Sequence, residues 1–315
     1  MAVSAVDPKP VLIDCDPGID DALALLLAMS EPTHLDIVAI TTVAGNVAAV
    51  QTERNARRLR DLAGRSEIAV FGGCRRPLLR PLQDAAHVHG ETGMDGCGLA
   101  APRGRPSQRH AVAAILSAVA KKPGQLTICA VGPLTNLAVA IVQRPDVMAQ
   151  LKGIVLMGGA AGAGNVTAHA EFNFYVDPEA ARIVFGSGIP IVMHGLDVTH
   201  IARVDRPWVD QLLTADTPVT RSVAGMLSVY NGGVDGDPRG RPVHDALAIA
   251  YLVHPEWFGG TDCHVAIETI NPDQIGRSHV RAGADIGEEG ANAQVIFEID
   301  ADRFRSYLAG QLQSL

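Results

Sequence analysis

The sequence of 315 residues lacks the features that mark several common classes of protein. It has five cysteines, an odd number, and no CxxC pair, so neither a zinc site nor a disulfide framework is indicated. No apolar stretch is long enough to span a bilayer, and the opening MAVSAVDPKP has no basic or long apolar region of a signal peptide. We therefore expect a cytoplasmic protein with free thiols and no membrane partner.

Basic charge is also scarce. The chain has 26 Lys and Arg against 34 Asp and Glu, a net charge of -8, which argues against nucleic acid as a partner because such binding depends on a basic surface. A Walker-type GxxxxGK[ST] loop is missing, and no segment has the spacing of an EF-hand loop. Aromatic residues make up only 4%, whereas glycine is abundant at 32 residues, which fits many tight turns between strands and helices.

What the chain does contain is a regular alternation of short apolar runs with helical patterns, and 47% hydrophobic residues to fill a large core. This alternation predicts a single-domain α/β fold over residues 1–315, with a doubly wound, mostly parallel, Rossmann-like sheet of about eight strands. Polar segments at 75–109 and 214–244 are expected to form long active-site loops. The expected strands are Val11–Cys15, Ile37–Thr42, Ile68–Phe71, Leu126–Val131, Gly153–Met157, Ile189–His194, His264–Glu268 and Ala293–Ile299. The expected helices are Asp20–Met29, Ala48–Ala63, Ala111–Ala120, Thr135–Val142, Pro178–Phe185, Pro218–Val229, Asp245–Val253 and Ala301–Leu312.

Four carboxylates, Asp14, Asp16, Asp20 and Asp21, follow the first expected strand in VLIDCDPGIDDALALLLA. One aspartate at this place is explained as a helix cap, because the start of a helix favours negative charge. Four are not, since carboxylates that converge must be protonated, paired or bound to a metal. A hard cation such as Ca²⁺, which accepts several oxygen ligands, would relieve their repulsion.

Other polar or glycine-rich segments follow other expected strands. Gly45 and Asn46 come after the second strand, Gly132 after the fourth and 157–159 after the fifth, while Asp245 opens a later helix next to His244. In doubly wound sheets the ligand lies beyond the carboxyl ends of the strands. We therefore expect these segments to meet at one site.

Two interpretations of the acidic turn compete at this point. Phosphatases of the haloacid dehalogenase type also place D-x-D after their first strand and use Mg²⁺ with a nucleophilic aspartate. They usually have Thr or Val where this chain has Gly18, and their mechanism does not require the pair Asp20 and Asp21.

The second interpretation comes from resemblance. DCDPGIDD closely resembles the D-x-D-P-G-x-D-D motif of the nucleoside hydrolases, the inosine–uridine-preferring family. Further segments similar to that family follow in order along nearly the whole chain. They are TTVAGNV at Thr41–Val47, HGETGMDG at His89–Gly96, VGPLTNLA at Val131–Ala138, LMGGAAGAGNVTAHAEFNFYVDPEAA at Leu156–Ala181 and PVHDALAIA at Pro242–Ala250.

The resemblance implies calcium-dependent hydrolysis of the N-glycosidic bond of a ribonucleoside, giving ribose and a free base. It implies an attacking water molecule held on the metal and a transition state of oxocarbenium character, with Asp16 as the general base. Positions matched to the family's motifs give Asp16, Asp21, Asp245 and the Val131 carbonyl as metal ligands. The ribose-binding positions that it implies are Asp20, Asn46, Met157, Asn165, Glu171 and Asn173.

The same resemblance places His89 and His244 on the base side of the pocket, as catalytic residues that assist the leaving base. Tyr230, the first residue of the glycine-rich stretch YNGGVDGDPRGR, is a further candidate for contact with the base. The two histidines favour the inosine/uridine type, and a homodimer or homotetramer is expected by analogy with the family. A calcium-dependent protein that binds a ribonucleoside or ribose without cleaving it is the alternative outside enzymes, but it would need none of Asp16, His89 and His244 for catalysis.

Overall fold

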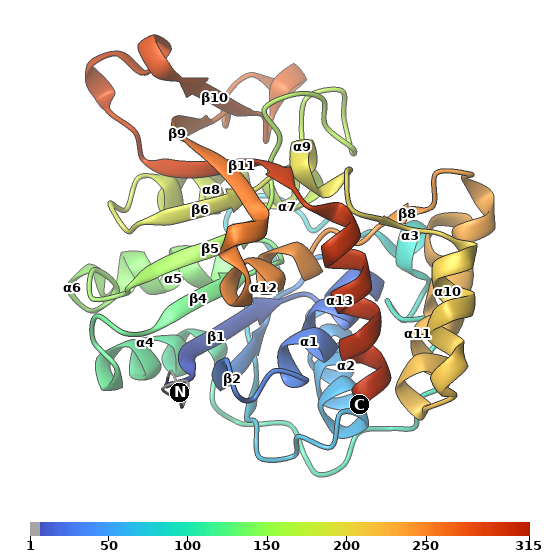
Figure 1. Cartoon of the computed structure of the whole chain (residues 1–315). Coiled ribbons are helices and arrows are strands. Elements are labelled where there is room, and N and C mark those ends of the chain that lie inside the picture. The colour runs from blue at the N-terminus through green and yellow to red at the C-terminus, as the bar shows by residue number, and fades with distance from the viewer. Residues whose placement is uncertain (1–6) are drawn as a thin grey trace, which may run out of the picture.

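The computed structural model describes residues 7–315, so most of the N-terminal stretch expected to lack a signal peptide lies outside it. Its centre is a nine-stranded sheet (Figure 1) made of β1 (Lys9–Cys15), β2 (Leu35–Thr42), β3 (Val70–Gly72), β4 (Thr127–Ala130), β5 (Gly153–Met157), β6 (Ile191–His194), β9 (Phe258–Ile267), β10 (Ser278–Ala282) and β11 (Ala293–Ile299). The strand order is β10-β9-β11-β6-β5-β4-β1-β2-β3. Pairing is parallel from β11 to β3, and β9 runs antiparallel to both of its neighbours. The doubly wound, mostly parallel sheet is therefore confirmed.

Helices connect the strands and cover the sheet. The longer ones are α1 (Ile19–Met29), α2 (Ala49–Leu62), α4 (Ala111–Lys121), α5 (Thr135–Gln143), α8 (Pro178–Phe185), α10 (Arg206–Leu212), α11 (Pro218–Val229), α12 (Ala246–Val253) and α13 (Ala301–Ser314). The four shortest are α3 (Ala86–His89), α6 (Pro145–Met148), α7 (Phe172–Val176) and α9 (Leu196–Thr199). Within residues 7–315, no helix combines the length and the apolar character needed to cross a membrane.

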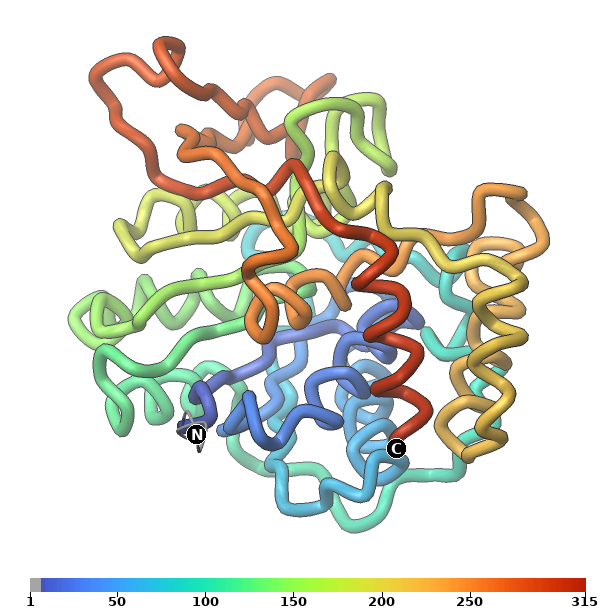
Figure 2. Tube along the Cα trace, in the orientation of Figure 1, coloured from blue at the N-terminus to red at the C-terminus, as the bar shows by residue number. Residues whose placement is uncertain are grey.

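Two apolar cores lie on opposite faces of the sheet, and the strand residues alternate between them. Val11 and Ile13 of β1 face a core shared with α1, α12 and α13, whereas Leu12 faces a core shared with α4, α5 and α8. Both faces are buried, which explains why these strands are continuous apolar runs. Figure 2 shows the C-terminal helix α13 running beside α1, a contact that joins the two ends of the chain.

The elements that the sequence did not predict are short or polar. β10 was missed because SHVRA carries charged and polar side chains on an edge strand, and β9 begins earlier than predicted because its first half contains FGGTD. A separate two-stranded ladder, β7 (Arg203–Val204) with β8 (Arg241–Pro242), is too short to leave a periodic signal. It matters for the site because it joins two loops on the same side of the molecule.

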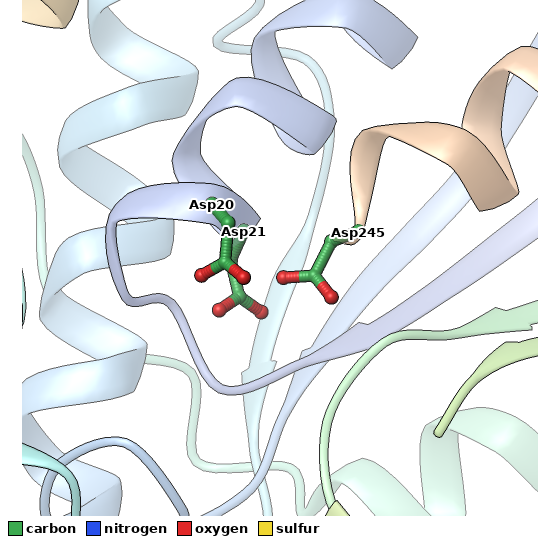
Figure 3. Close-up of side chains that lie close together, drawn as sticks. All are labelled: Asp20, Asp21 and Asp245. Atoms are coloured by element: carbon green, nitrogen blue, oxygen red, sulfur yellow. The ribbon is translucent and has the colours of Figure 1, made fainter. Parts of the chain in front are cut away.

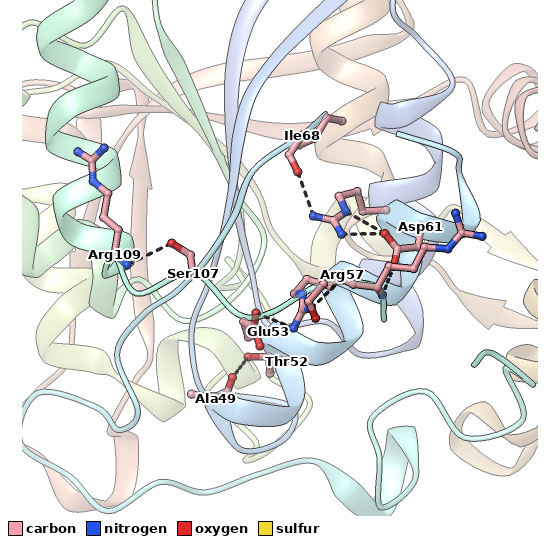
Figure 4. Close-up of polar contacts among 11 residues, drawn as sticks. Ala49, Thr52, Glu53, Arg57, Asp61, Ile68, Ser107 and Arg109 are labelled. Atoms are coloured by element: carbon pink, nitrogen blue, oxygen red, sulfur yellow. Dashed lines mark hydrogen bonds and ion pairs between the residues drawn. The ribbon is translucent and has the colours of Figure 1, made fainter. Parts of the chain in front are cut away.

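The long polar segment 75–109 is fastened to helix α2. Arg57 donates to the carbonyl of Arg103 at 2.8 Å and to that of Gly104 at 2.7 Å, and the Arg103 amide donates to Asp61 at 2.6 Å. Figure 4 shows this group of polar contacts along α2. The segment contains α3, so its attachment helps to fix the position of His89.

Candidate active site

A cavity of about 800 Å³ lies beyond the carboxyl ends of the central strands. Asp16 and Asp21 do not line it; both are fully buried behind its wall. The remaining residues predicted from the sequence all do, and they are Asp20, Asn46, His89, Val131, Met157, Asn165, Glu171, Asn173, Tyr230, His244 and Asp245. The segments that were expected to converge therefore do so.

The acidic turn between β1 and α1 is held by its own backbone. Asp21 accepts a hydrogen bond from the Asp16 amide and another from the Gly18 amide, both at 3.0 Å. A side chain at Gly18 would have no room, because its Cβ would lie 2.7 Å from the side-chain Nδ2 of Asn46 and from Nδ1 of His89. The turn is thus packed between the two loops that carry Asn46 and His89.

Three carboxylates point toward one another across the cavity wall (Figure 3). Asp20 and Asp21 come from the first turn of α1 and Asp245 immediately precedes α12, and each offers an oxygen within 4.8 Å of the others. The sequence predicted Asp16 in the ligand set in place of Asp20. Asp16 lies beside this trio, where its Oδ2 accepts the Asn46 amide at 2.6 Å and its Oδ1 has no hydrogen-bond partner.

Two glycines make the space that Asp16 occupies. A Cβ at Gly45 would lie 2.0 Å from Oδ2 of Asp16, and a Cβ at Gly132 would lie 2.4 Å from Oδ1. Both distances are far below van der Waals contact, so any other residue at either position would displace the carboxylate. The glycines after the second and fourth expected strands therefore serve the acidic cluster directly.

The carboxylates are buried without compensating positive charge. Within residues 7–315 none of Asp16, Asp20, Asp21 and Asp245 pairs with Lys or Arg, and the nearest ionisable base is His89, at 3.8 Å from Asp20. Burial, together with mutual repulsion, raises the pKa of Asp21 to about 7 and the pKa values of Asp16 and Asp245 well above the usual range. Oxygen donors alone, with unpartnered Oδ1 atoms on Asp16 and Asp20, fit a hard divalent cation.

The neighbouring wall is built by the start of α7. Glu171 caps that helix by accepting from the Asn173 and Phe174 amides, and it also accepts from the Gly159 amide at 2.8 Å. Burial raises the pKa of Glu171 to about 7. The Asn173 side chain donates to the carbonyls of Val131 at 3.0 Å and Met157 at 3.2 Å, so it ties together the ends of β4 and β5.

The opposite end of the cavity carries histidines. Nδ1 of His89 accepts a hydrogen bond from the Ile19 amide at 3.1 Å, which leaves Nε2 protonated and available as a donor. Burial lowers the pKa of His89 to about 3, so its ring is neutral at neutral pH. The ring of Tyr230 lies 5.3 Å from that of His89, and Nδ1 of His244 lies 2.7 Å from the Thr199 hydroxyl oxygen.

Comparison with known proteins agrees with this geometry. Residues 11–306 match the model of the family described as inosine-uridine preferring nucleoside hydrolase. The chain belongs to this nucleoside hydrolase family. It is 42% identical over 307 residues to the pyrimidine-specific ribonucleoside hydrolase RihA of Shewanella sp. (strain MR-7), covering 96% of each chain. It is 43% identical over 301 residues to the non-specific ribonucleoside hydrolase RihC of Salmonella newport, covering 95% of this chain and 96% of that one.

Solved structures give the same assignment. The purine-preferring ribonucleoside hydrolase from Gardnerella vaginalis superposes with a TM-score of 0.91 at 29% identity, covering 97% of this chain and 98% of that one. A plant nucleoside hydrolase, PpNRh1, also has a TM-score of 0.91, at 30% identity and with 98% and 100% covered. The chain is therefore an N-ribosyl hydrolase, and the phosphatase interpretation of the acidic turn is not favoured.

Several residues that support this nucleoside hydrolase site were not predicted as part of it. The side-chain amide of Asn136, at the start of α5, donates to Asp14 at 2.8 Å. The buried Asn55 donates to the carbonyls of Pro17 and Thr92, joining the acidic turn to the loop after His89. Thr199 was not singled out at all. Their partners are far away in sequence, so only the folded chain identifies them.

Proposed function

We propose that this protein is a calcium-dependent ribonucleoside hydrolase of the inosine/uridine type, which uses water to split the N-glycosidic bond into ribose and a free base. The observation that carries the proposal is the group of buried carboxylates without counter-charges, at a cavity whose next wall is the Glu171–Asn173 segment. One divalent cation and the hydroxyl groups of a ribose would together satisfy these carboxylate oxygens.

The proposed cation ligands are Asp16, Asp21, Asp245 and the Val131 carbonyl, and Asp20 is close enough to join or replace one of them. All are hard oxygen donors, the type that Ca²⁺ prefers, and the set contains no nitrogen or sulfur. A bound divalent cation offsets the repulsion among the carboxylates and lowers the pKa of a water molecule.

Asp16 is the proposed general base. Its Oδ2 is fixed by the Asn46 amide, so the unpartnered Oδ1 can take the proton of the attacking water molecule. General-base assistance of this kind is worth about 10² to 10⁴ in rate. The surrounding carboxylates also place negative potential next to the sugar, where the oxocarbenium-like transition state develops positive charge.

Asp20, Asn46, Asn165, Glu171 and Asn173 are the proposed ribose contacts, and Met157 lines the cavity beside them. Removal of the 2′-hydroxyl would leave buried polar groups unpaired, so we expect ribonucleosides to be strongly preferred over their 2′-deoxy forms. At the other end, His244 is the proposed donor of a proton or a hydrogen bond to the leaving base, and burial lowers its pKa to about 4, so its ring is also neutral at neutral pH. His89, held neutral, is proposed to donate a hydrogen bond from Nε2 to an acceptor on the base.

A reducing-sugar assay with uridine and inosine, with and without a chelator, tests the proposal. We expect ribose release that the chelator abolishes and calcium restores, and Asp16→Asn should lower the turnover by about 10² to 10⁴. Asp146→Asn, a change to an exposed aspartate paired with Arg144, is the control and should retain full activity. Binding of uridine without ribose release would instead indicate the non-catalytic binding protein. A rate of ribose release that is the same with and without the chelator would show that the reaction does not need a metal ion. The homo-oligomeric state and the cytoplasmic location stay predictions.

A further inference from the structure

Thr199 is a buried residue at the end of α9, and its hydroxyl oxygen lies 2.7 Å from Nδ1 of His244. We propose that Thr199 is a positioning residue, which fixes the His244 ring so that Nε2 faces the departing base. This inference rests on the proposed function, since it assumes that His244 assists the leaving group. It assigns a role to a residue that lies outside the cavity lining.

The contact is a consequence of the β7–β8 ladder. Arg203 pairs with Pro242 in that ladder, and the pairing continues as the Val243 amide donates to the Ala202 carbonyl at 3.3 Å. The two strands run antiparallel. The end of α9, which precedes β7, and His244, which follows β8, therefore lie beyond the same end of the ladder. Thr199 therefore meets His244 through backbone pairing, and the contact does not depend on long flexible side chains.

Helix α9 is also fastened at its start. The Leu196 amide donates to the Gly159 carbonyl at 2.9 Å, and Asp197 accepts from the Ala161 amide at 2.6 Å and the Gly162 amide at 3.0 Å. These partners belong to the segment between β5 and α7, which also carries the proposed ribose contacts Asn165 and Glu171. Through α9, the position of the His244 ring is set relative to the sugar.

No other side chain in residues 7–315 hydrogen-bonds the His244 ring. The ring of His200 is its near neighbour, with centroids 5.6 Å apart, but it makes no hydrogen bond to His244. The Thr199 hydroxyl therefore holds the rotamer of the His244 ring, with Nδ1 engaged and Nε2 left to face the cavity. Without it the ring could turn, and Nε2 would lose its fixed direction toward the cavity.

Thr199→Val removes the hydroxyl and keeps the shape, whereas Thr199→Ser keeps the hydroxyl. Turnover of uridine, whose base needs help to leave, is compared with turnover of 4-nitrophenyl riboside, whose aglycone leaves unaided. We expect Thr199→Val to lower kcat for uridine about 10- to 100-fold, as loss of a residue that orients a catalytic group does, with little change in KM. Thr199→Val should slow the nitrophenyl substrate less than about threefold. Thr199→Ser should recover most of the rate with uridine. His244→Ala should likewise slow uridine more than the nitrophenyl substrate.

Thr135→Val is the matched control, because it also removes a buried hydroxyl, which donates to Asp177 at 2.6 Å away from His244. It should slow both substrates alike or neither. Equal slowing of both substrates by Thr199→Val, or failure of Thr199→Ser to restore the rate, would overturn the proposal. If the wild-type protein releases no ribose from either substrate, the proposed function itself fails. Comparison of the ¹⁵N shifts of the His244 ring between the wild type and Thr199→Val then still reports whether Thr199 hydrogen-bonds to Nδ1.

Discussion

The two ends of the cavity are built differently. At the acidic end, the site residues lie at strand ends and helix starts, and backbone amides hold their carboxylates. The Asn46 backbone amide donates to Asp16 and that of Gly18 to Asp21. The Gly159 backbone amide donates to Glu171. At the histidine end, the rings come from the short helix α3 and from the turn before α12, and each is held through a single hydrogen bond at Nδ1. The sheet thus fixes the groups proposed for the sugar and the cation, while connecting segments place those proposed for the base.

The relatives differ in the way this contrast suggests. All are named as ribonucleoside or nucleoside hydrolases, yet RihA is described as pyrimidine-specific, RihC as non-specific and the Gardnerella vaginalis enzyme as purine-preferring. A common reaction with a variable base is what an acidic end held by the sheet and a histidine end carried by connecting segments would produce. The segments around His89 and 230–244 are therefore the places at which base preference is best tested.

The largest effect that would sharpen the comparison is expected at the acidic end. Gly132→Ala should lower kcat/KM by about 10²-fold, because the new Cβ would lie 2.4 Å from Oδ1 of Asp16 and would displace it. Gly310→Ala is the matched control, since its Cβ meets nothing within 4 Å in α13; it should keep full activity and unfold at the same or a slightly higher temperature. Normal turnover of Gly132→Ala would show that the position of Asp16 is not critical.

A smaller and different effect is expected at the histidine end. His89→Ala removes one proposed hydrogen bond to the base, which is worth about 0.5 to 1.5 kcal/mol, or roughly 2- to 13-fold in kcat/KM. The ratio of kcat/KM between inosine and uridine should therefore change, while the preference for ribose over 2′-deoxyribose stays as in the wild type. Steady-state kinetics on inosine, uridine and their 2′-deoxy forms measures both ratios. Loss of the ribose preference would mean that the two ends are not independent.

The smallest effect concerns the stability of the metal-free protein. Burial raises the pKa values of Asp14, Asp21 and Glu171 to about 7, whereas unfolded Asp and Glu titrate near 4. The folded state therefore binds more protons between about pH 4 and pH 7, and the free energy of unfolding should fall as pH rises through that window. Thermal unfolding at pH 5 and pH 8 checks the sign. Added calcium should raise the melting temperature most at pH 8, and a metal-free protein that is more stable at pH 8 would contradict the assignment.

Most of the fold was predictable because buried parallel strands are apolar throughout. Two helices, Pro178–Phe185 and Pro218–Val229, have the predicted bounds, since a proline begins each of them. β10 was not predicted because an edge strand that is half exposed needs no apolar pattern. The β7–β8 ladder consists of two residues on each side, which is below what any periodicity can reveal.

The site was predictable as far as its motifs reach. Local spacing and resemblance indicated Asp20, Asp21 and Asp245, which the fold brings together. Neither could show that Asp16 lies behind the cavity wall, because that depends on how closely Gly45 and Gly132 approach it. The contact between Thr199 and His244 likewise depends on pairing between two distant segments and has no local signature.

The short ladder of β7 and β8 has a practical consequence. It brackets residues 205–240, a segment that includes α10 and α11, so that this segment leaves and re-enters the body of the protein at neighbouring points. A segment with such an anchored stem can be exchanged as a unit when the apolar side chains of α11 that pack against α1 are kept. Grafting the corresponding segment of a purine-preferring relative onto this stem is therefore a direct route to an enzyme with redesigned selectivity.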